Sequence, residues 1–156
     1  MPALDGQYRN AIGTLAARLD GDEPWALTGS ASFALQGVPV EPNDIDVQTT
    51  EAGAYAIESA FTDRVVEPVS FSAAEGITSH FGALELADVR VEIMGAVQKR
   101  RSDGAWEPPV DVTEHRRFVD LDGRSVPVLS LQYEAAAYER LGRQERAALL
   151  SEHATE

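Results

Sequence analysis

The stretch Trp25–Thr50, WALTGSASFALQGVPVEPNDIDVQTT, decides the fold that the sequence predicts. Its first four residues form an apolar run that is too short for a helix and is bounded by turn residues, so we expect a buried strand over 25–28. Gly29 and Ser30 follow, and Ser30 is expected to cap a short, alanine-rich helix over 31–36. The stretch therefore begins as a strand that turns directly into a helix.

The same stretch ends on two carboxylates. A loop over 38–43 leads to Asp44-Ile45-Asp46-Val47, where β-branched residues predict a strand over 44–49. Residues two apart in a strand share a face, so Asp44 and Asp46 are expected to project side by side. Their mutual repulsion would be relieved by a divalent cation such as Mg²⁺, which favours carboxylates and phosphate oxygens. The alternative is an ordinary polar face exposed to solvent.

Glu92 is the third candidate carboxylate. In the predicted strand 89–94, the three aliphatic residues alternate with Arg90, Glu92 and Met94. If the aliphatic faces of both strands pack on helices, Glu92 lies on the same face as the aspartate pair, and three carboxylates suffice for two metal ions. A lone strand glutamate is also commonly just solvated, and the spacing does not show that the two strands are neighbours.

Gly29-Ser30 is a candidate phosphate-binding turn. Backbone N–H groups at a strand-to-helix turn can face a phosphate, glycine leaves room for its approach, and the serine hydroxyl can add a hydrogen bond. The sequence is not a P-loop, because it has no G-x-x-x-x-G-K-[ST] pattern. An ordinary glycine turn with a serine cap is the alternative.

The rest of the chain supports a single domain over residues 1–156, of α+β or mixed α/β class. Further helices are predicted over 3–20, 51–61, 131–141 and 144–151, an edge strand over 65–71, a hairpin of 80–86 with 89–94, a polar loop over 99–109, and a hairpin of 118–121 with 126–129 closed by Asp122-Gly123.

Composition excludes several classes of protein. The chain has no cysteine, which excludes disulfides and thiolate metal sites, and no apolar run near the length of a membrane span. The first residues do not resemble a signal peptide, so we expect a cytoplasmic protein. A net charge of −13 disfavours general nucleic-acid binding. The acidic surface serves solubility or is an adaptation to salt, and the second reading predicts stability that rises with KCl.

The order of these motifs resembles the DNA polymerase β-like nucleotidyltransferase superfamily. The match lies in an apolar strand ending in Gly29-Ser30, followed by the apolar-flanked Asp44-Ile45-Asp46-Val47, with Glu92 as a later strand carboxylate. The C-terminal part, from Val126 to Arg146, is similar to small single-domain members, including aminoglycoside and lincosamide nucleotidyltransferases and the nucleotidyltransferases of toxin–antitoxin pairs.

The resemblance implies a mixed β-sheet with helices packed on one face and an open catalytic face. It implies transfer of a nucleoside monophosphate from an NTP, most simply ATP, to an acceptor hydroxyl, with release of pyrophosphate. Asp44, Asp46 and Glu92 would be the catalytic metal ligands for Mg²⁺ or Mn²⁺. Gly29 and Ser30 would hold the β- and γ-phosphates, a role that suits the positioning needs of phosphoryl transfer.

The resemblance leaves the other substrate contacts open. Members often place a basic residue in the last helices facing the triphosphate, and Arg143 and Arg146 are the candidates here. Tyr138, His80 and Trp106 could line an acceptor cleft for a small molecule, a tRNA or a protein hydroxyl. The alternatives to an active enzyme are a non-catalytic nucleotide-binding or antitoxin-like module with a helical toxin-type partner, and a metal-free structural domain.

Overall fold

The computed structural model describes residues 4–19 and 23–154. The helices are α1 (Gly6–Arg18), α2 (Gly29–Leu35), α3 (Glu51–Ala60), the 3₁₀ turn η1 (Thr62–Arg64), α4 (Val112–His115), α5 (Leu131–Arg140) and α6 (Gln144–His153). The strands are β1 (Trp25–Thr28), β2 (Ile45–Thr49), β3 (Val65–Ala74), β4 (Ile77–Leu86), β5 (Val89–Lys99), β6 (Arg116–Leu121) and β7 (Arg124–Leu129). The predicted α+β class is confirmed.

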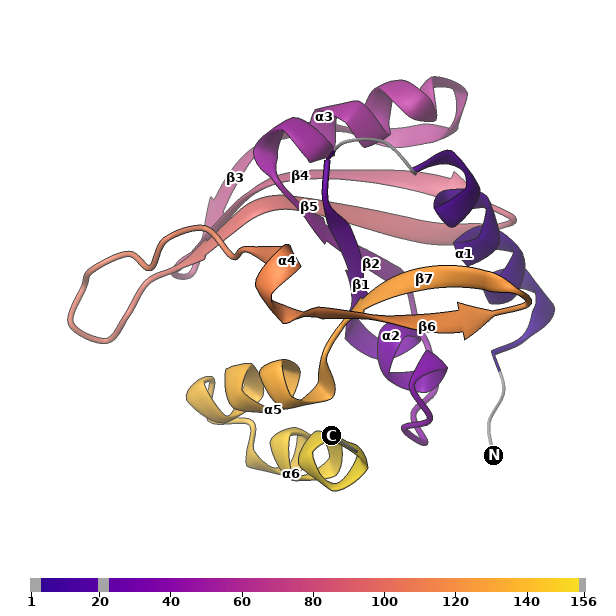
Figure 1. Cartoon of the computed structure of the whole chain (residues 1–156). Coiled ribbons are helices and arrows are strands. Elements are labelled where there is room, and N and C mark those ends of the chain that lie inside the picture. Colours follow the sequence, from indigo (N-terminus) through magenta and orange to yellow (C-terminus); the bar gives the residue numbers. More distant parts are fainter. Residues whose placement is uncertain (1–3, 20–22, 155–156) are drawn as a thin grey trace.

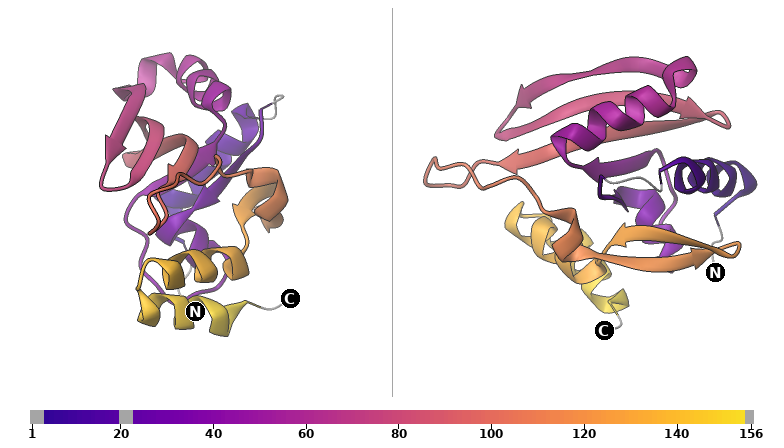
Figure 2. Two further views of the ribbon diagram at one scale, coloured as in Figure 1. Left: turned by 90° about the vertical axis from the view of Figure 1, so that its left-hand side faces the viewer. Right: turned by 45° about the horizontal axis from the view of Figure 1, so that its top comes forward.

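All seven strands form one mixed sheet in the order β3-β4-β5-β2-β1-β7-β6 (Figure 1). The β2 strand is antiparallel to β1 and parallel to β5. The strands that carry Asp46 and Glu92 are therefore neighbours, a point that their spacing in the sequence left open. The short strands β1 and β2 form the centre of the sheet. The three strands β3, β4 and β5 lie on one side of them, and the hairpin β6-β7 lies on the other side (Figure 2).

One face of the sheet is aliphatic and packs on α1 and α3. Ile45 and Val47 of β2 and Val91 and Ile93 of β5 are fully buried there, in one cluster with side chains of both helices. Because side chains alternate along a strand, the residues between them point to the other face. That other face carries the candidate site, and α5 and α6 pack together beside it.

The two predicted hairpin turns are confirmed. Ala87 and Asp88 have φ of 51° and 64°, and Asp122 and Gly123 have φ of 54° and 83°. Positive φ at both central residues is the geometry of tight turns whose twist matches that of the flanking strands. The β3 strand lies at the sheet edge as expected from Pro68, and its pairing with β4 is irregular on either side of that residue.

All five strands after residue 64 are longer than predicted. The β5 strand runs on to Lys99, five residues beyond the expected end, because its partner β4 begins at Ile77 and supplies hydrogen bonds along that length. The short helix α4 was not predicted. The segment between β5 and α4 projects from the body of the protein (Figure 1) and is closed by a bridge between Arg100 and Trp106.

The C-terminal helices form an antiparallel pair across a glycine. Gly142 has φ of 80° and donates its N–H to the Glu139 carbonyl, and the Arg143 N–H donates to the Tyr138 carbonyl. This turn ends α5 and sends α6 back along it. Within the described residues, no helix is long and apolar enough to cross a membrane.

Candidate active site

One cavity of about 290 Å³ brings the predicted site residues together. It lies where β1 turns into α2, between the polar face of the central strands and the two C-terminal helices. Its lining includes every residue predicted to bind metal or nucleotide, namely Gly29, Ser30, Asp44, Asp46, Glu92, Arg143 and Arg146, together with Phe33, Asn43 and Tyr138. These residues come from five separate parts of the chain, so the cavity exists only in the folded protein.

Strand register aligns the carboxylates. Asp46 pairs with Thr28 of β1 on one side and with Glu92 of β5 on the other. Neighbouring strands are about 4.8 Å apart, so the two carboxylates meet on one face. Asp44 lies one residue before β2, outside the strand but within the same cavity.

The environment of Asp46 changes the pKa of its carboxyl group. Burial, followed by the negative charges of Glu92 and Asp44, raises the pKa of Asp46 to about 7. A bound cation acts in the opposite direction, because it favours the charged form of a carboxylate. Asp46 is therefore a buried carboxylate beside two others, and its charged form is disfavoured unless a cation binds.

Gly29 is required by the approach of its backbone to Asp46. A Cβ atom at this position would lie 2.3 Å from the Asp46 Oδ2 atom, and Gly29 has φ of 76°. No larger side chain fits without moving the carboxylate, and an L-residue at this φ adds backbone strain. Gly29 therefore sets the distance between the strand-to-helix turn and the carboxylates.

The expected capping role of Ser30 was wrong. The helix α2 begins two residues earlier, at Gly29, with Thr28 at the N-cap position and no side-chain cap. The Ser30 hydroxyl instead accepts a hydrogen bond from the Asn43 N–H at 2.9 Å. The Tyr8 hydroxyl donates to the carbonyl of the same residue, Asn43. Ser30 thus fixes the loop that delivers Asp44 to the cavity.

Glu92 is held partly aside by a cation. The Arg90 Nε atom lies 2.8 Å from the Glu92 Oε2 atom, and Arg90 also reaches Glu67 at 3.4 Å. Among the described residues, no three acidic or histidine side chains already converge as a finished metal site. The donor set nevertheless suits Mg²⁺ or Mn²⁺, because it offers only oxygens and places the buried Asp46 beside two other carboxylates.

The structure adds Glu134, which the sequence analysis missed. This residue of α5 is 5% exposed, and its carboxylate accepts hydrogen bonds from the Thr28 hydroxyl and the Gly29 N–H. Burial raises its pKa to about 7, against the effects of these donors and of Lys99. Through these two hydrogen bonds Glu134 stabilises the turn between β1 and α2. The sequence around Glu134 is that of an ordinary amphipathic helix. The one available signal was an acidic residue at a position of the helix that faces the protein interior.

The last helix supplies positive charge opposite the acids. Arg143 lies at the N-cap position of α6 and Arg146 lies one turn later, with its guanidinium 5.9 Å from the centre of the Phe33 ring. Tyr138 packs edge-on against the same ring, with centroids 6.1 Å apart. The cavity therefore has an acidic wall formed by the sheet and a basic, aromatic wall formed by the helices.

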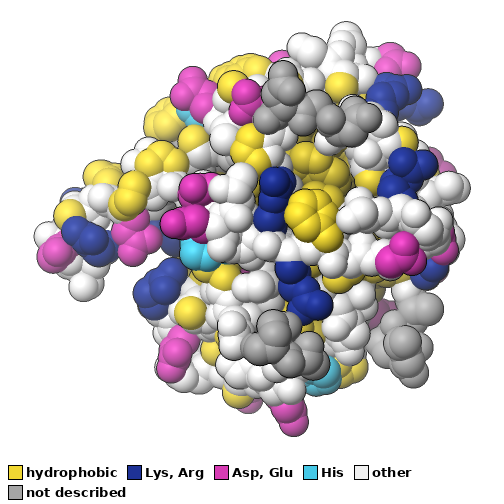
Figure 3. All heavy atoms as spheres, in the orientation of Figure 1, with side chains coloured by type: hydrophobic (Ala, Val, Ile, Leu, Met, Phe, Trp, Pro, Cys, Tyr) yellow, Lys and Arg dark blue, Asp and Glu magenta, His cyan; other side chains and the backbone are white. Residues whose placement is uncertain are grey.

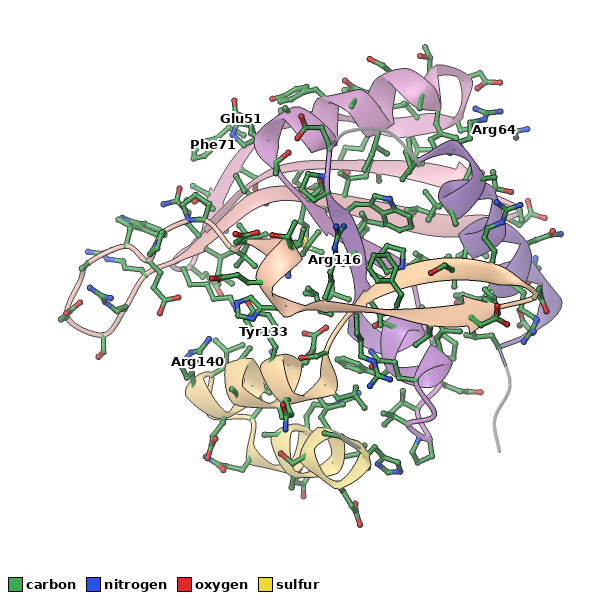
Figure 4. The ribbon with its side chains drawn as sticks, viewed as in Figure 1. Glu51, Arg64, Phe71, Arg116, Tyr133 and Arg140 are labelled. Carbon is green, nitrogen blue, oxygen red and sulfur yellow. The ribbon has the colours of Figure 1, made fainter. Side chains whose placement is uncertain are left out.

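Two of the three expected acceptor-cleft residues lie elsewhere. Tyr138 lines the cavity, whereas His80 packs between Tyr55 and Phe71 and lies 3.7 Å from Glu51. Figure 4 shows Glu51 and Phe71 together at the far side of the sheet, near α3. Trp106 is in the projecting loop and is 44% exposed. The expectation that His80 and Trp106 line this cavity was wrong.

Comparison with known proteins agrees with this geometry. Residues 12–155 match the aminoglycoside-2''-adenylyltransferase family. A protein of Thermotoga maritima assigned as a nucleotidyltransferase is 49% identical, with 96% of this chain and 93% of that chain covered and a TM-score of 0.86. No curated protein sequence matches the chain.

More distant solved structures share the fold. The antibiotic-resistance factor ANT(2'')-Ia is 16% identical over 94% of this chain and 84% of its own, with a TM-score of 0.58. The lincosamide antibiotic adenylyltransferase LnuA, bound to lincomycin, is 10% identical over 96% of this chain and 98% of its own, also with a TM-score of 0.58. The chain has the nucleotidyltransferase fold and belongs to the aminoglycoside-2''-adenylyltransferase family.

Proposed function

We propose that the protein is a metal-dependent nucleotidyltransferase that moves a nucleoside monophosphate, most simply AMP from ATP, onto an acceptor hydroxyl. The observation that carries this proposal is the pairing of Asp46 with Glu92 directly in front of a glycine turn that admits no side chain. In the transfer, the acceptor oxygen forms a bond to the α-phosphorus, the bond from that phosphorus to the bridging oxygen breaks, and pyrophosphate leaves.

The residues of the cavity divide this work between them. Asp44, Asp46 and Glu92 would hold Mg²⁺ or Mn²⁺, which supplies charge neutralisation at the phosphoryl oxygens. The turn at Gly29 and Ser30 would place the terminal phosphates. Glu92 lies opposite Asp46 on the neighbouring strand and would accept the proton of the acceptor hydroxyl when its contact with Arg90 opens.

The basic wall would complete the nucleotide site. Arg143 and Arg146 face the carboxylates across the cavity and would bind the triphosphate oxygens. Tyr138 offers an aromatic surface next to them. These groups position the nucleotide and offset its charge, which is what phosphoryl transfer requires of a protein.

The acceptor is proposed to be a small hydroxyl-bearing molecule. The family name and the distant neighbours refer to aminoglycoside and lincosamide antibiotics, which makes such molecules the first to test. A tRNA and a protein hydroxyl, including one of this chain, are the other acceptor classes. A helical toxin-type partner finds no support in the matched family and structures.

The test is incubation of the full chain with labelled NTPs, Mg²⁺ or Mn²⁺, and an acceptor panel of aminoglycosides, lincosamides, tRNA and the protein itself. We expect label transfer that disappears in Asp44→Ala and Asp46→Ala and persists in Asp88→Asn, an acid in the distant β4-β5 turn. Transfer that survives both active-site substitutions would contradict the site assignment.

The second candidate is a non-catalytic nucleotide-binding module, and the contact between Glu92 and Arg90 is the observation that favours it. If this contact is permanent, the third carboxylate is unavailable. The protein would then be stabilised by NTP with Mg²⁺, seen as a higher melting temperature, but would transfer no label to any acceptor.

A further inference from the structure

A second cavity, of about 350 Å³, lies beside the C-terminal end of α5. Its polar and charged lining residues are Lys99, Arg100, Arg101, Ser102, Glu107 and Arg140. The helix α5 forms a wall of both cavities, because Tyr138 lines the catalytic one and Ala137 lines the second. Figure 4 shows Arg140 at the end of α5 on the side from which the loop after β5 projects.

The charge of this lining is opposite to that of the chain. Four cationic side chains and one carboxylate line the cavity, in a chain with 13 cationic and 26 acidic residues. Lys99 is the only lysine in the sequence. Dark-blue cationic side chains are visible on the projecting loop in Figure 3. A solvated surface of this protein would carry about two acids for each base, so this lining is not a sample of the general surface.

The cations of this cavity differ in their contacts: Arg101 lies 3.7 Å from Asp103, Arg100 donates to the Gly104 carbonyl at 3.4 Å, and Lys99 and Arg140 are crowded together. Burial, and next the charge of Arg140, lowers the pKa of Lys99, while the more distant carboxylates of Glu134 and Glu107 act against this. Among the residues that the structure describes, neither Lys99 nor Arg140 forms an ion pair. Like charges that outnumber the nearby carboxylates favour the binding of an anion.

The loop that carries two of these cations has its own internal hydrogen bonds. The Arg101 N–H donates to the Ala105 carbonyl at 2.7 Å, and the Glu107 N–H donates to the Lys99 carbonyl at 2.8 Å. The Arg100 N–H donates to the Gly76 carbonyl at 2.8 Å, which ties the loop to the β3-β4 turn. The arginines therefore project from a defined hairpin.

We propose that this cavity is a second ligand site, which binds a phosphate group at a place separate from the carboxylate cavity. The planar guanidinium group of Arg140 matches the oxygens of a phosphate, the Lys99 ammonium adds a point charge, and Arg100 and Arg101 line the same cavity with donors left over from their contacts to Gly104 and Asp103. The Ser102 hydroxyl is a further donor at the rim. The phosphate belongs either to an organic phosphate monoester or to the free inorganic ion.

Calorimetric titration of the full chain tests the proposal, with inorganic phosphate in one arm and glycerol 3-phosphate in the other. The titrations are done without NTP, with EDTA present and with ionic strength held constant by NaCl, so that general screening does not count as binding. We expect saturable binding. Tighter binding of the monoester assigns the site to an organic phosphate, and equal or weaker binding assigns it to the inorganic ion.

Variants locate the bound phosphate. Lys99→Met and Arg140→Gln should each weaken binding roughly tenfold or more, because each removes a charge-assisted contact. Arg143→Gln and Arg146→Gln alter the carboxylate cavity and should leave phosphate binding unchanged, as should the distant Arg124→Gln. Lys99→Arg keeps the charge and should retain binding, which separates loss of the site from loss of folding.

Three results would overturn the proposal. They are the absence of saturable binding, binding that Lys99→Met and Arg140→Gln do not affect, and binding that Arg143→Gln removes, which would place the ion in the carboxylate cavity. Since no NTP or divalent cation is present, these results are independent of label transfer. Either proposal can therefore fail while the other stands.

Discussion

The two cavities that share α5 have opposite electrostatic character. The carboxylate cavity is lined by three carboxylates together with Arg143 and Arg146, whereas the second is lined by four cations and one carboxylate. In the first, burial and then the negative charges of Glu92 and Asp44 raise the pKa of Asp46, and in the second, burial and then the positive charge of Arg140 lower the pKa of Lys99. We therefore expect the first cavity to bind a cation and the second to bind an anion.

The two cavities position their charged side chains by different structural means. The acids are fixed by strand register, which cannot slip without exposing the aliphatic face of β2 and β5. The cations are placed by a short helix, a glycine turn and a projecting hairpin. Glu134 stands between the two groups, under the influence of both Asp46 and Lys99.

The largest effect is expected from Gly29→Ala, which tests the rigidity of the acidic wall. Its Cβ would displace the Asp46 carboxylate, and a displacement of about 1 Å can cost roughly 100-fold in rate. Gly123→Ala has a similar φ but open space around its Cβ, so it should cost only the roughly 1–2 kcal/mol of the backbone conformation. Turnover and denaturant unfolding of both variants, if equal, would refute the close-approach role.

A smaller effect should follow from Arg143→Gln, which tests the basic wall of the catalytic cavity. Loss of one charge-assisted contact to the triphosphate should raise the KM for NTP roughly tenfold, with a smaller change in kcat. Arg124→Gln, on the exposed start of β7, is the matched control. Steady-state kinetics with varied NTP measure both, and an unchanged KM in Arg143→Gln would place the triphosphate elsewhere.

Arg90→Gln tests whether the acidic wall is restrained by its own salt bridge. Removal of the 2.8 Å contact frees Glu92, so Mn²⁺ should bind about three- to tenfold more tightly. Arg64→Gln, on the exposed 3₁₀ turn, removes the same charge without touching the site. Electron paramagnetic resonance of free Mn²⁺ gives both dissociation constants. Weaker binding in Arg90→Gln would mean that Arg90 orients Glu92 for the metal.

The smallest effect concerns Glu134 and pH. Burial raises its pKa from 4.5 to about 7, so the folded state holds a proton that the unfolded state has released over this range. Its contribution to stability is full below pH 4.5 and is lost as the pH rises through about 7. The difference in melting temperature between the wild type and Glu134→Gln should therefore shift by roughly 2–5 °C against the wild type between pH 5 and 8.

Glu139→Gln, an exposed residue of the same helix, is the control for this pH dependence. It should run parallel to the wild type across the whole range. If Glu134→Gln also runs parallel, the buried carboxylate does not titrate between pH 5 and 8.

Much of the site could be predicted from local sequence, because its parts are local. The apolar run before Gly29, the alternation around Asp46 and the parity of Glu92 each reflect the conformation of one segment. The two hairpin turns were equally local, since Ala87-Asp88 and Asp122-Gly123 carry their own turn chemistry. The order of these segments then indicated the superfamily.

What the tertiary structure alone decided was which segments meet. Pairing of Asp46 with Glu92 and bracing of the Gly29 turn by Glu134 join residues whose spacing in sequence carries no such information. The cluster around Lys99 was invisible for the same reason, because Arg140 reaches it from another element. The contact of Arg90 with Glu92 is different, because residues two apart in a strand share a face. Local sequence determines conformation through nearby backbone sterics, whereas long-range contacts are selected by burial of the whole aliphatic face at once.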